Sequence, residues 1–116
     1  IDHINAHGTS TPLGDVVESK AIRELFQESA DNIYVSSTKS MTGHLLGAAG
    51  AIESIFSILA IKDKVIPPTI NLNNPDNEAK LKLVANNSIE EKVSFVMNNT
   101  FGFGGTNVSL IFKEFE

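Results

Sequence analysis

The chain has 116 residues, 41% of them hydrophobic, and a formal net charge of −5 at pH 7. Such a chain buries roughly two-thirds of the surface that its unfolded form exposes, enough for a core, so we expect one domain over residues 1–116. The negative charge argues against a nucleic-acid partner, because phosphate binding needs clustered lysine and arginine. The sequence has no cysteine, which excludes disulfides, thiolate metal sites and a thiol nucleophile within this chain.

No segment predicts a membrane partner. The longest apolar stretch, around Ile52 to Ile61, is too short and too interrupted by serine and glutamate to span a bilayer. No signal peptide is visible, and we expect a cytoplasmic protein, bacterial or organellar. The sequence opens at Ile1 without methionine and enters a strand pattern at once, which indicates a piece of a longer chain.

In chain order, hydrophobic periodicity predicts a strand, a helix, a strand, a second helix and two final strands. The expected strands cover residues 1–8, 32–38, 93–100 and 107–115, and the expected helices cover residues 15–28 and 43–62. Residues 65–76 form a proline-punctuated loop, and residues 101–106 a tight turn. This order predicts an α/β fold with a mixed sheet of about four strands and two main helices.

The second predicted helix is apolar on nearly every side. Its interior polar residues are Glu53, Ser54 and Ser57. Its three glycines, which leave a smooth stripe for close backbone approach, are Gly43, Gly47 and Gly50. A helix that is apolar all round must be covered on all sides, which two helices and four strands cannot do. We therefore expect this helix to lie between two layers, one of them outside this chain.

Two short motifs suggest catalysis or metal binding. Residues 36–39 match S-x-x-K, a serine–lysine nucleophile pattern, but the S-D-N and K-T-G elements that accompany it are absent. His3 and His7 could share a strand face and bind a metal together with His44. No carboxylate is obviously placed to complete such a site, and His3 reads as a structural residue.

The glycine-rich turn at residues 101–106 is not a dinucleotide fingerprint, because its glycines are wrongly spaced and it does not open a helix. The pattern fits equally well a tight hairpin between the last two strands and a loop that places Phe103 and its backbone N–H at a site.

Two of the histidines are also candidates for catalysis. His7 lies at the end of a strand, and His44 lies in the first turn of the second predicted helix. Both positions suit a site at the carboxyl ends of strands. A helix N-terminus disfavours imidazolium, so His44 is predisposed to stay neutral and to donate a hydrogen bond to a developing oxyanion. Lys39 could fix protonation states through a carboxylate such as Glu18. The alternative, which spacing alone slightly favours, is that Lys39 is a surface charge and both histidines are satisfied turn residues.

Four long segments resemble the C-terminal portion of elongating β-ketoacyl-acyl-carrier-protein synthases, most closely the type II synthases of fatty-acid synthesis. They are "NAHGTSTPLGD", "SSTKSMTGHLLGAAGAIES", "PPTINLNNPD" and "NNTFGFGGTNVSLIF", and the match runs in order from Ile1 to Phe112. The resemblance implies the C-terminal half of a thiolase-like fold, in which two α/β halves stack in five layers. It also implies a homodimer in the full-length enzyme.

The activity implied by the resemblance is that of an acyltransferase, a 3-oxoacyl-[acyl-carrier-protein] synthase. The parent enzyme would condense an acyl-enzyme thioester with malonyl-acyl carrier protein and release CO2. The family uses a Cys-His-His triad whose cysteine lies outside this chain, so the chain alone is expected to be inactive. Acyl carrier protein is the implied partner, and its phosphopantetheine carries the acyl groups, so no separate cofactor is expected.

The resemblance assigns the two triad histidines to His7 and His44, which would hydrogen-bond the malonyl thioester oxygen as enolate charge develops. Lys39 matches the family's lysine, and Glu18 the glutamate that pairs with it. Phe103 matches a gating phenylalanine whose backbone N–H completes the oxyanion hole. The implied contacts to pantetheine are Thr9, Thr11, Phe101 and Phe103. No firm metal site is implied, although some members bind a monovalent cation near the positions of Asn5 and Glu53.

Two other functions share much of this pattern. A polyketide ketosynthase domain would carry the same residues, although the ending "LIFKEFE", with no linker after it, favours a free-standing enzyme. A non-catalytic binding or assembly module could keep the fold without the chemistry. Degradative thiolases fit less well, because they use a second cysteine in this half.

Overall fold

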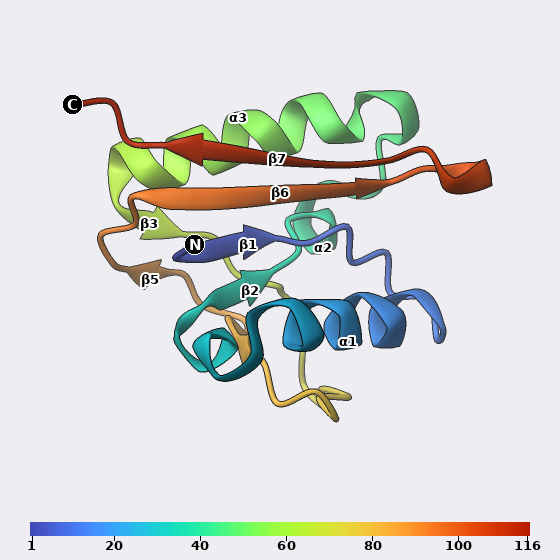
Figure 1. The fold of residues 1–116 in the computed structure, drawn as a ribbon. Helices are drawn as coiled ribbons and strands as arrows, with labels where there is room; N and C mark the ends of the chain where they lie inside the picture. Colours follow the sequence, from blue (N-terminus) through green and yellow to red (C-terminus); the bar gives the residue numbers. More distant parts are fainter.

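The computed structural model describes residues 1–116, and its centre is a five-stranded sheet with the order β4-β2-β1-β6-β7 (Figure 1). The strands are β1 (His3–Asn5), β2 (Tyr34–Ser36), β4 (Lys82–Leu83), β6 (Phe95–Phe101) and β7 (Asn107–Lys113). The first four run parallel to one another, whereas β7 is antiparallel to β6. The mixed sheet expected from the sequence is therefore confirmed, with a fifth strand, β4, that the pattern did not predict.

Two main helices cover opposite faces of this sheet (Figure 1). Helix α1 (Gly14–Phe26) connects β1 to β2, and α3 (Ala49–Asp63) follows β2 after the short α2 (Lys39–Thr42). A separate antiparallel pair joins β3 (Val65–Ile66) to β5 (Ile89–Glu90). Three short 3-10 helices complete the fold, namely η1 (Gln27–Asn32), η2 (Leu46–Ala48) and η3 (Phe103–Gly105).

Alternation along the strands divides the interior into two hydrophobic clusters. Ile4 of β1 packs with Ile22 of α1 and Met97 of β6. On the other face, Val96 of β6 packs with Ala60 of α3. Because successive strand side chains point to opposite faces, the residues on either side of Ile4 face the α3 layer. Polar groups near the carboxyl end of β1 are thereby placed beneath α3.

Helix α1 buries only part of its apolar side. Ile22 is buried and Phe26 packs against the core. In contrast, Val17 and Leu25, which share the helical spacing, are exposed. The buried acidic residue of this helix is Glu18. One face of α1 thus combines core packing with a carboxylate directed toward the strand ends.

The second predicted helix is wrong at its start, because α3 begins at Ala49 and His44 lies in a loop. Gly43 ends α2 with φ +75° and Leu46 has φ +52°, both outside the helical range. Only one of the three glycines meets a neighbour closely. A Cβ on Gly50 would lie 3.2 Å from Thr100 Oγ1, whereas nothing lies within 4 Å of one on Gly47.

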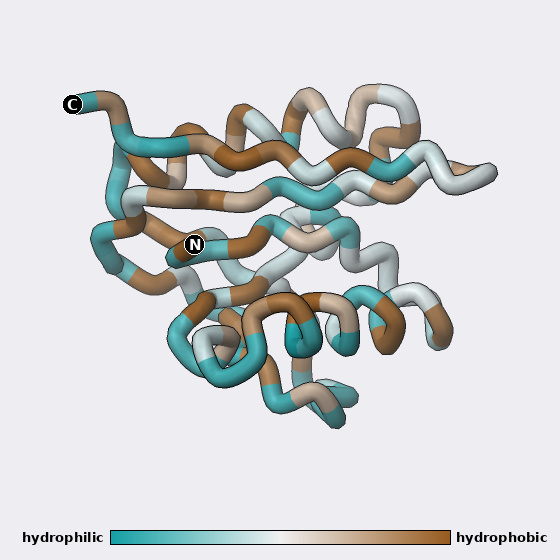
Figure 2. Tube along the Cα trace, in the orientation of Figure 1, coloured by the Kyte–Doolittle hydropathy of each residue, from teal (hydrophilic) through white to brown (hydrophobic).

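Helix α3 turns polar groups inward and apolar groups outward. Glu53 and Ser57 are buried, whereas Ile55 and Ile58 are about half exposed. Hydrophobic positions recur along the whole of α3 (Figure 2). This agrees with the expectation that a further layer covers α3, because an exposed apolar face is unfavourable in water. None of the helices combines the length and the apolar character that crossing a membrane requires.

His3 is fully buried, and its Nε2 lies 2.9 Å from Ser36 Oγ while its Nδ1 has no hydrogen-bond partner. Burial lowers the pKa of His3 from 6.5 to about 4. Between these two pH values the unfolded chain binds the extra proton, so stability rises with pH through this window. The structural role expected for His3 fits this environment.

We therefore expect the full-length protein to lose about 3 kcal/mol of stability from this group as the pH falls from 6.5 to 4. Urea unfolding measured at pH steps across the window checks this expectation. A His3→Gln variant, which keeps a side-chain N–H near Ser36 and does not titrate, should show a flatter dependence. Equal slopes in the two proteins would contradict a buried neutral imidazole.

Candidate functional site

The candidate residues meet where parallel strands end. His7 follows β1, Lys39 begins α2 shortly after β2, and Phe101 ends β6. Since β1 pairs in parallel with both β2 and β6, these three ends lie at one edge of the sheet. The sequence predicted this location for His7, and carboxyl-end crevices are where ligands bind in open α/β sheets.

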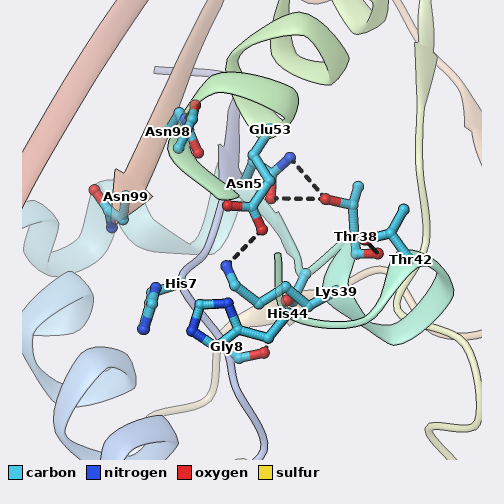
Figure 3. A network of polar contacts seen from close by, with 12 residues as sticks. Asn5, His7, Gly8, Thr38, Lys39, Thr42, His44, Glu53, Asn98 and Asn99 are labelled. Atoms are coloured by element: carbon cyan, nitrogen blue, oxygen red, sulfur yellow. Dashed lines mark hydrogen bonds and ion pairs between the residues drawn. The ribbon is translucent and has the colours of Figure 1, made fainter. Parts of the chain in front are cut away.

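His7 and His44 lie side by side, although 37 positions of the sequence separate them (Figure 3). Their ring centroids are 5.5 Å apart and the rings are nearly perpendicular, at 86°. The ring of Phe101 lies 5.4 Å from that of His7 on another side. Two imidazoles this close can direct N–H groups at one small ligand atom.

A backbone contact fixes the donor nitrogen of His44. Leu46 N donates to His44 Nδ1 at 3.1 Å. An imidazole nitrogen that accepts a hydrogen bond carries no proton, so in the neutral ring the proton is on Nε2. The prediction that His44 donates from a helix N-terminus is corrected here. His44 lies in a loop, and the contact with Leu46, not a helix dipole, selects the ring nitrogen that donates.

His7 is held neutral by its surroundings. Burial is the main cause that lowers the pKa of His7 to about 4, and the positive charge of Lys39 and the neighbouring His44 lower it further. Its Nδ1 is buried without a hydrogen-bond partner. The free Nε2 is therefore the nitrogen through which a neutral His7 can donate.

Lys39 forms a buried ion pair with Glu53, and not with Glu18 as predicted (Figure 3). Lys39 Nζ lies 2.5 Å from Glu53 Oε1, and the two side chains are 5% and 1% exposed. The reason is topological: β2 leads Lys39 toward α3, whereas Glu18 lies on α1. Lys39 is therefore not a surface charge. A Ser36–Lys39 nucleophile pair is not formed either, because Ser36 bonds His3.

Glu18 instead holds the backbone of the loop that carries His7. Its two carboxylate oxygens accept the N–H groups of His7 and Gly8, each at 2.9 Å. Asn99 Nδ2 also donates to Glu18 Oε1 at 3.3 Å. Burial raises the pKa of Glu18, although these three hydrogen bonds oppose the rise. Glu18 thus supports His7 through the main chain.

Gly8 occupies a position that no larger residue fits. Its φ of +38° lies in the left-handed region, and a Cβ there would lie 2.7 Å from Ser37 Cβ. We expect Gly8→Ala to destabilise the full-length protein by about 1–3 kcal/mol through clash and backbone strain. Chemical denaturation measures this loss, and adding Ser37→Gly, which removes the clashing Cβ, should restore part of it. A neutral Gly8→Ala variant would contradict the close approach.

A cavity of about 510 Å³ opens beside His44. Thr9, Asp15 and His44 are among the residues that line it. Burial raises the pKa of Asp15, which accepts the Ser10 N–H at 3.1 Å. Thr11 does not line this cavity, and its hydroxyl accepts the Gly14 N–H at 3.1 Å.

The side chain of Phe103 is not packed against either histidine. The turn between β6 and β7 leaves its ring fully exposed. The phenylalanine that contacts His7 is Phe101. Of the two interpretations of this turn, the hairpin describes the backbone, since β6 and β7 pair along their whole lengths.

Two buried oxygens beneath α3 lack hydrogen-bond partners, Glu53 Oε2 and Asn98 Oδ1. Asn5, which the sequence linked with Glu53, exchanges weak hydrogen bonds with Thr38 Oγ1 at 3.3 and 3.4 Å. An unpaired carboxylate oxygen such as Glu53 Oε2 is a suitable ligand for a hard cation. No three His, Asp or Glu side chains group to hold a metal, which argues against the three-histidine metal alternative.

Sequence reasoning missed Asn99 and the pairing role of Glu53. The available signal was polarity in apolar surroundings, because Asn98 and Asn99 interrupt a buried strand and Glu53 lies in an apolar helix. Buried polar groups require partners. Which groups become those partners depends on which helix covers which face of the sheet. The sequence pattern does not give that arrangement.

The chain is similar to known proteins of one family. The family described as beta-ketoacyl synthase, C-terminal domain, matches residues 1–73. A 3-oxoacyl-[acyl-carrier-protein] synthase 2 of Coxiella burnetii is 57% identical over 111 residues, which cover 96% of this chain and 27% of that protein. A beta-ketoacyl synthase structure from Burkholderia phymatum has a TM-score of 0.91 and 41% identity, over 100% of this chain and 28% of that one.

A third match is a ketosynthase seen with its carrier protein. The structure of a type II PKS acyl-carrier protein in complex with its ketosynthase bound to the hexaketide has a TM-score of 0.92 and 37% identity. The match covers 97% of this chain and 28% of that one. This chain therefore spans less than a third of each protein that it matches here.

Proposed function

This chain belongs to the beta-ketoacyl synthase C-terminal domain family, and on that premise we propose that residues 1–116 form the C-terminal domain of a 3-oxoacyl-[acyl-carrier-protein] synthase. Its fold is that of the C-terminal half of the thiolase-like ketosynthases that it matches. The full-length enzyme condenses an acyl-enzyme thioester with malonyl-acyl carrier protein and releases CO2 during fatty-acid elongation.

The observation that carries this proposal is the pair of imidazoles of His7 and His44, whose ring centroids lie 5.5 Å apart at the sheet edge. Loss of CO2 from a malonyl thioester moves an electron pair onto the thioester oxygen, which becomes an enolate oxyanion. Two N–H donors aimed at that oxygen stabilise the charge as it develops. Both histidines must donate an N–H. The Leu46 contact leaves Nε2 as the donor of His44, and burial lowers the pKa of His7.

The carbon–carbon bond forms on the other half of the enzyme. A cysteine thiolate outside this chain holds the acyl group as a thioester, and the enolate carbon attacks its carbonyl carbon. The thiolate leaves as the product ketone forms. This chain supplies the donors for decarboxylation and the framework that holds them, so it is not expected to complete the reaction alone.

Lys39 and Glu53 act in this proposal as a fixed charge pair behind the histidines. The cation of Lys39 lowers the pKa of His7 and so keeps it a neutral donor. A monovalent cation near Asn5 and Glu53, as in some relatives, would satisfy Glu53 Oε2, which is buried without a partner.

The substrate would reach the histidines on the phosphopantetheine arm of acyl carrier protein, with no further cofactor. The ketosynthase structure with a bound carrier protein supports this partner. Thr9 lines the cavity beside His44, which supports a contact with the arm. The other proposed contacts are Thr11, Phe101 and Phe103, with the Phe103 N–H at the oxyanion. We place the enzyme in the cytoplasm as a homodimer.

A polyketide ketosynthase is the second candidate, because the solved match with a hexaketide is one. Identity favours fatty-acid synthesis, since the curated match is 57% identical and that structure 37%. The products distinguish them. An elongating fatty-acid enzyme should extend saturated acyl chains by two carbons for each malonyl group, whereas a polyketide enzyme should accept a β-ketoacyl chain repeatedly.

The test is CO2 release by the purified full-length protein from malonyl-acyl carrier protein, with and without an acyl-carrier-protein donor. We expect CO2 release in both cases and a two-carbon longer 3-oxoacyl product when the donor is present. A full-length protein that binds carrier protein without releasing CO2 would refute the enzyme and favour a binding or assembly module.

A further inference from the structure

Asn99 occupies a buried position that the proposed reaction does not use. It lies on β6 and is 5% exposed. Its Nδ2 donates to Glu18 Oε1 at 3.3 Å, and its Oδ1 accepts from Ser109 Oγ on β7 at 2.8 Å. Asn99 thus connects an edge strand of the sheet to a carboxylate on α1.

The orientation of the Asn99 amide matters because Glu18 also binds the backbone of the turn that carries His7. An ionised carboxylate only accepts hydrogen bonds, and Glu18 accepts from His7 N, Gly8 N and Asn99 Nδ2. Asn99 must therefore present its NH2 group and keep its oxygen away. The Ser109 hydroxyl donates to that oxygen, and a donor on the far end of an amide strengthens donation from the near end.

We propose that Asn99 is a positioning residue for His7, acting through the Glu18 carboxylate, with Ser109 fixing the orientation of its amide. Two of the three donors on Glu18 come from the turn that carries His7, and only Asn99 connects the carboxylate to the sheet. Without that third contact the carboxylate and the turn can shift together relative to His44. The inference rests on the proposed function for what His7 does, and it adds residues on β6 and β7 to the site.

The sharpest variant is Asn99→Asp, which keeps the size and replaces the N–H donor with an oxygen. At pH 8 two carboxylates would face each other and repel. At pH 5.5 two neighbouring carboxylates share a proton, and the shared O–H restores a donor to Glu18. The other titratable groups here are Asp15 on α1, whose charge raises the pKa of Glu18, and His7 with its neighbours Lys39 and His44.

We expect Asn99→Asp in the full-length protein to lower kcat for CO2 release by about 10- to 100-fold at pH 8, as loss of a supporting contact does. The KM should stay near its wild-type value, because the contact orients a group that acts in the transition state. At pH 5.5 the variant should recover most of the loss relative to wild type at the same pH. A residue that only supports the fold gives no such recovery.

Matched variants separate this inference from general damage. Asn77→Asp also removes an amide N–H donor, from the Leu81 carbonyl contact of 2.8 Å, far along the chain from His7, and it should leave kcat unchanged at both pH values. Ser109→Ala should give a smaller loss than Asn99→Asp, and Ser109→Thr, which retains the hydroxyl, should restore the rate. These serine variants keep the test usable if Asn99→Asp folds poorly.

Crystal structures of full-length Asn99→Asp at pH 8 and pH 5.5 provide a readout that needs no activity. The separation of the His7 and His44 ring centroids, 5.5 Å here, should change at pH 8 and return at pH 5.5. Inactive wild-type enzyme would refute the proposed function, and the two structures would then decide the positioning. Active wild type with an unchanged ring separation in the variant, or with the same kcat ratio at both pH values, would overturn the inference.

Discussion

Lys39→Met is expected to lower the free energy of unfolding of the full-length protein by about 3–5 kcal/mol, as removing one partner of a buried ion pair does. The Lys39–Glu53 pair is almost completely buried. Methionine fills similar space without charge, so the Glu53 carboxylate would stay buried with neither oxygen hydrogen-bonded, because Oε2 already lacks a partner. Urea unfolding followed by circular dichroism at neutral pH measures the loss.

Two further variants are the controls for this prediction. Lys92→Met removes the cation from an exposed pair with Glu114, 3.5 Å apart, and should cost at most about 1 kcal/mol. Lys39→Met combined with Glu53→Met replaces both charges by apolar groups and should recover most of the stability. A loss for Lys39→Met no larger than that for Lys92→Met would contradict the buried pair.

Lys39→Met also changes the acid side of the pH dependence. The positive charge of Lys39 is one of the causes that lower the pKa of His7 to about 4, after burial. Without that charge the pKa of His7 rises, so its ring takes up a proton at a higher pH. A protonated His7 is no longer the neutral N–H donor that the proposed reaction uses. CO2 release should therefore decline at a higher pH than in wild type.

The Lys39–Glu53 ion pair also shows how much of the structure can be predicted from sequence patterns. Apolar alternation and helical spacing predicted the α/β fold, and the strand that ends before Gly8 placed His7 at the correct edge. The same pattern offered Glu18 as a partner for Lys39, because an acidic residue on either helix looks equally suitable. Only the layer order decides between them, since α1 and α3 cover opposite faces and β2 leads Lys39 to α3.

His44 illustrates a second limit. The sequence around it continues the apolar pattern of α3 without a break, so periodicity extends the helix back to Gly43. The backbone departs from that pattern at two residues with positive φ, Gly43 and Leu46. A left-handed leucine has no sequence signal. It nevertheless places the Leu46 N–H on His44 Nδ1 and selects the nitrogen that can donate.

Helix α3 connects the fold to the chemistry. Its inward side carries Glu53 and Ser57, both almost fully buried, while Ile55 and Ile58 face outward. A carboxylate is costly to bury, and the cation of Lys39 offsets that cost. The outward apolar face gains free energy only when a second layer covers it. We infer that the same helix holds the charge pair behind the histidines and docks against the remainder of the enzyme.

Removing either imidazole is expected to reduce CO2 release from malonyl-acyl carrier protein by about 100- to 1,000-fold, the effect of losing one oxyanion donor. His7→Ala and His44→Ala each leave the other ring alone at the enolate oxygen, and the ring separation of 5.5 Å allows no substitute from the remaining histidine. The rate should fall in kcat, because the charge that they stabilise develops only in the transition state. Radiolabelled CO2 release by the full-length variants measures it.

The matched control is His3→Gln, which removes a buried histidine of β1, the strand that His7 follows, where it contacts Ser36. Its effect should be on stability, with kcat near that of wild type at pH 8. The double variant of His7 and His44 should lose less than the product of the two single losses, because the two donors act on one oxygen and neither is fully effective alone. Full CO2 release by both single variants would refute the assigned roles, whereas loss in only one would identify the histidine that stabilises the enolate.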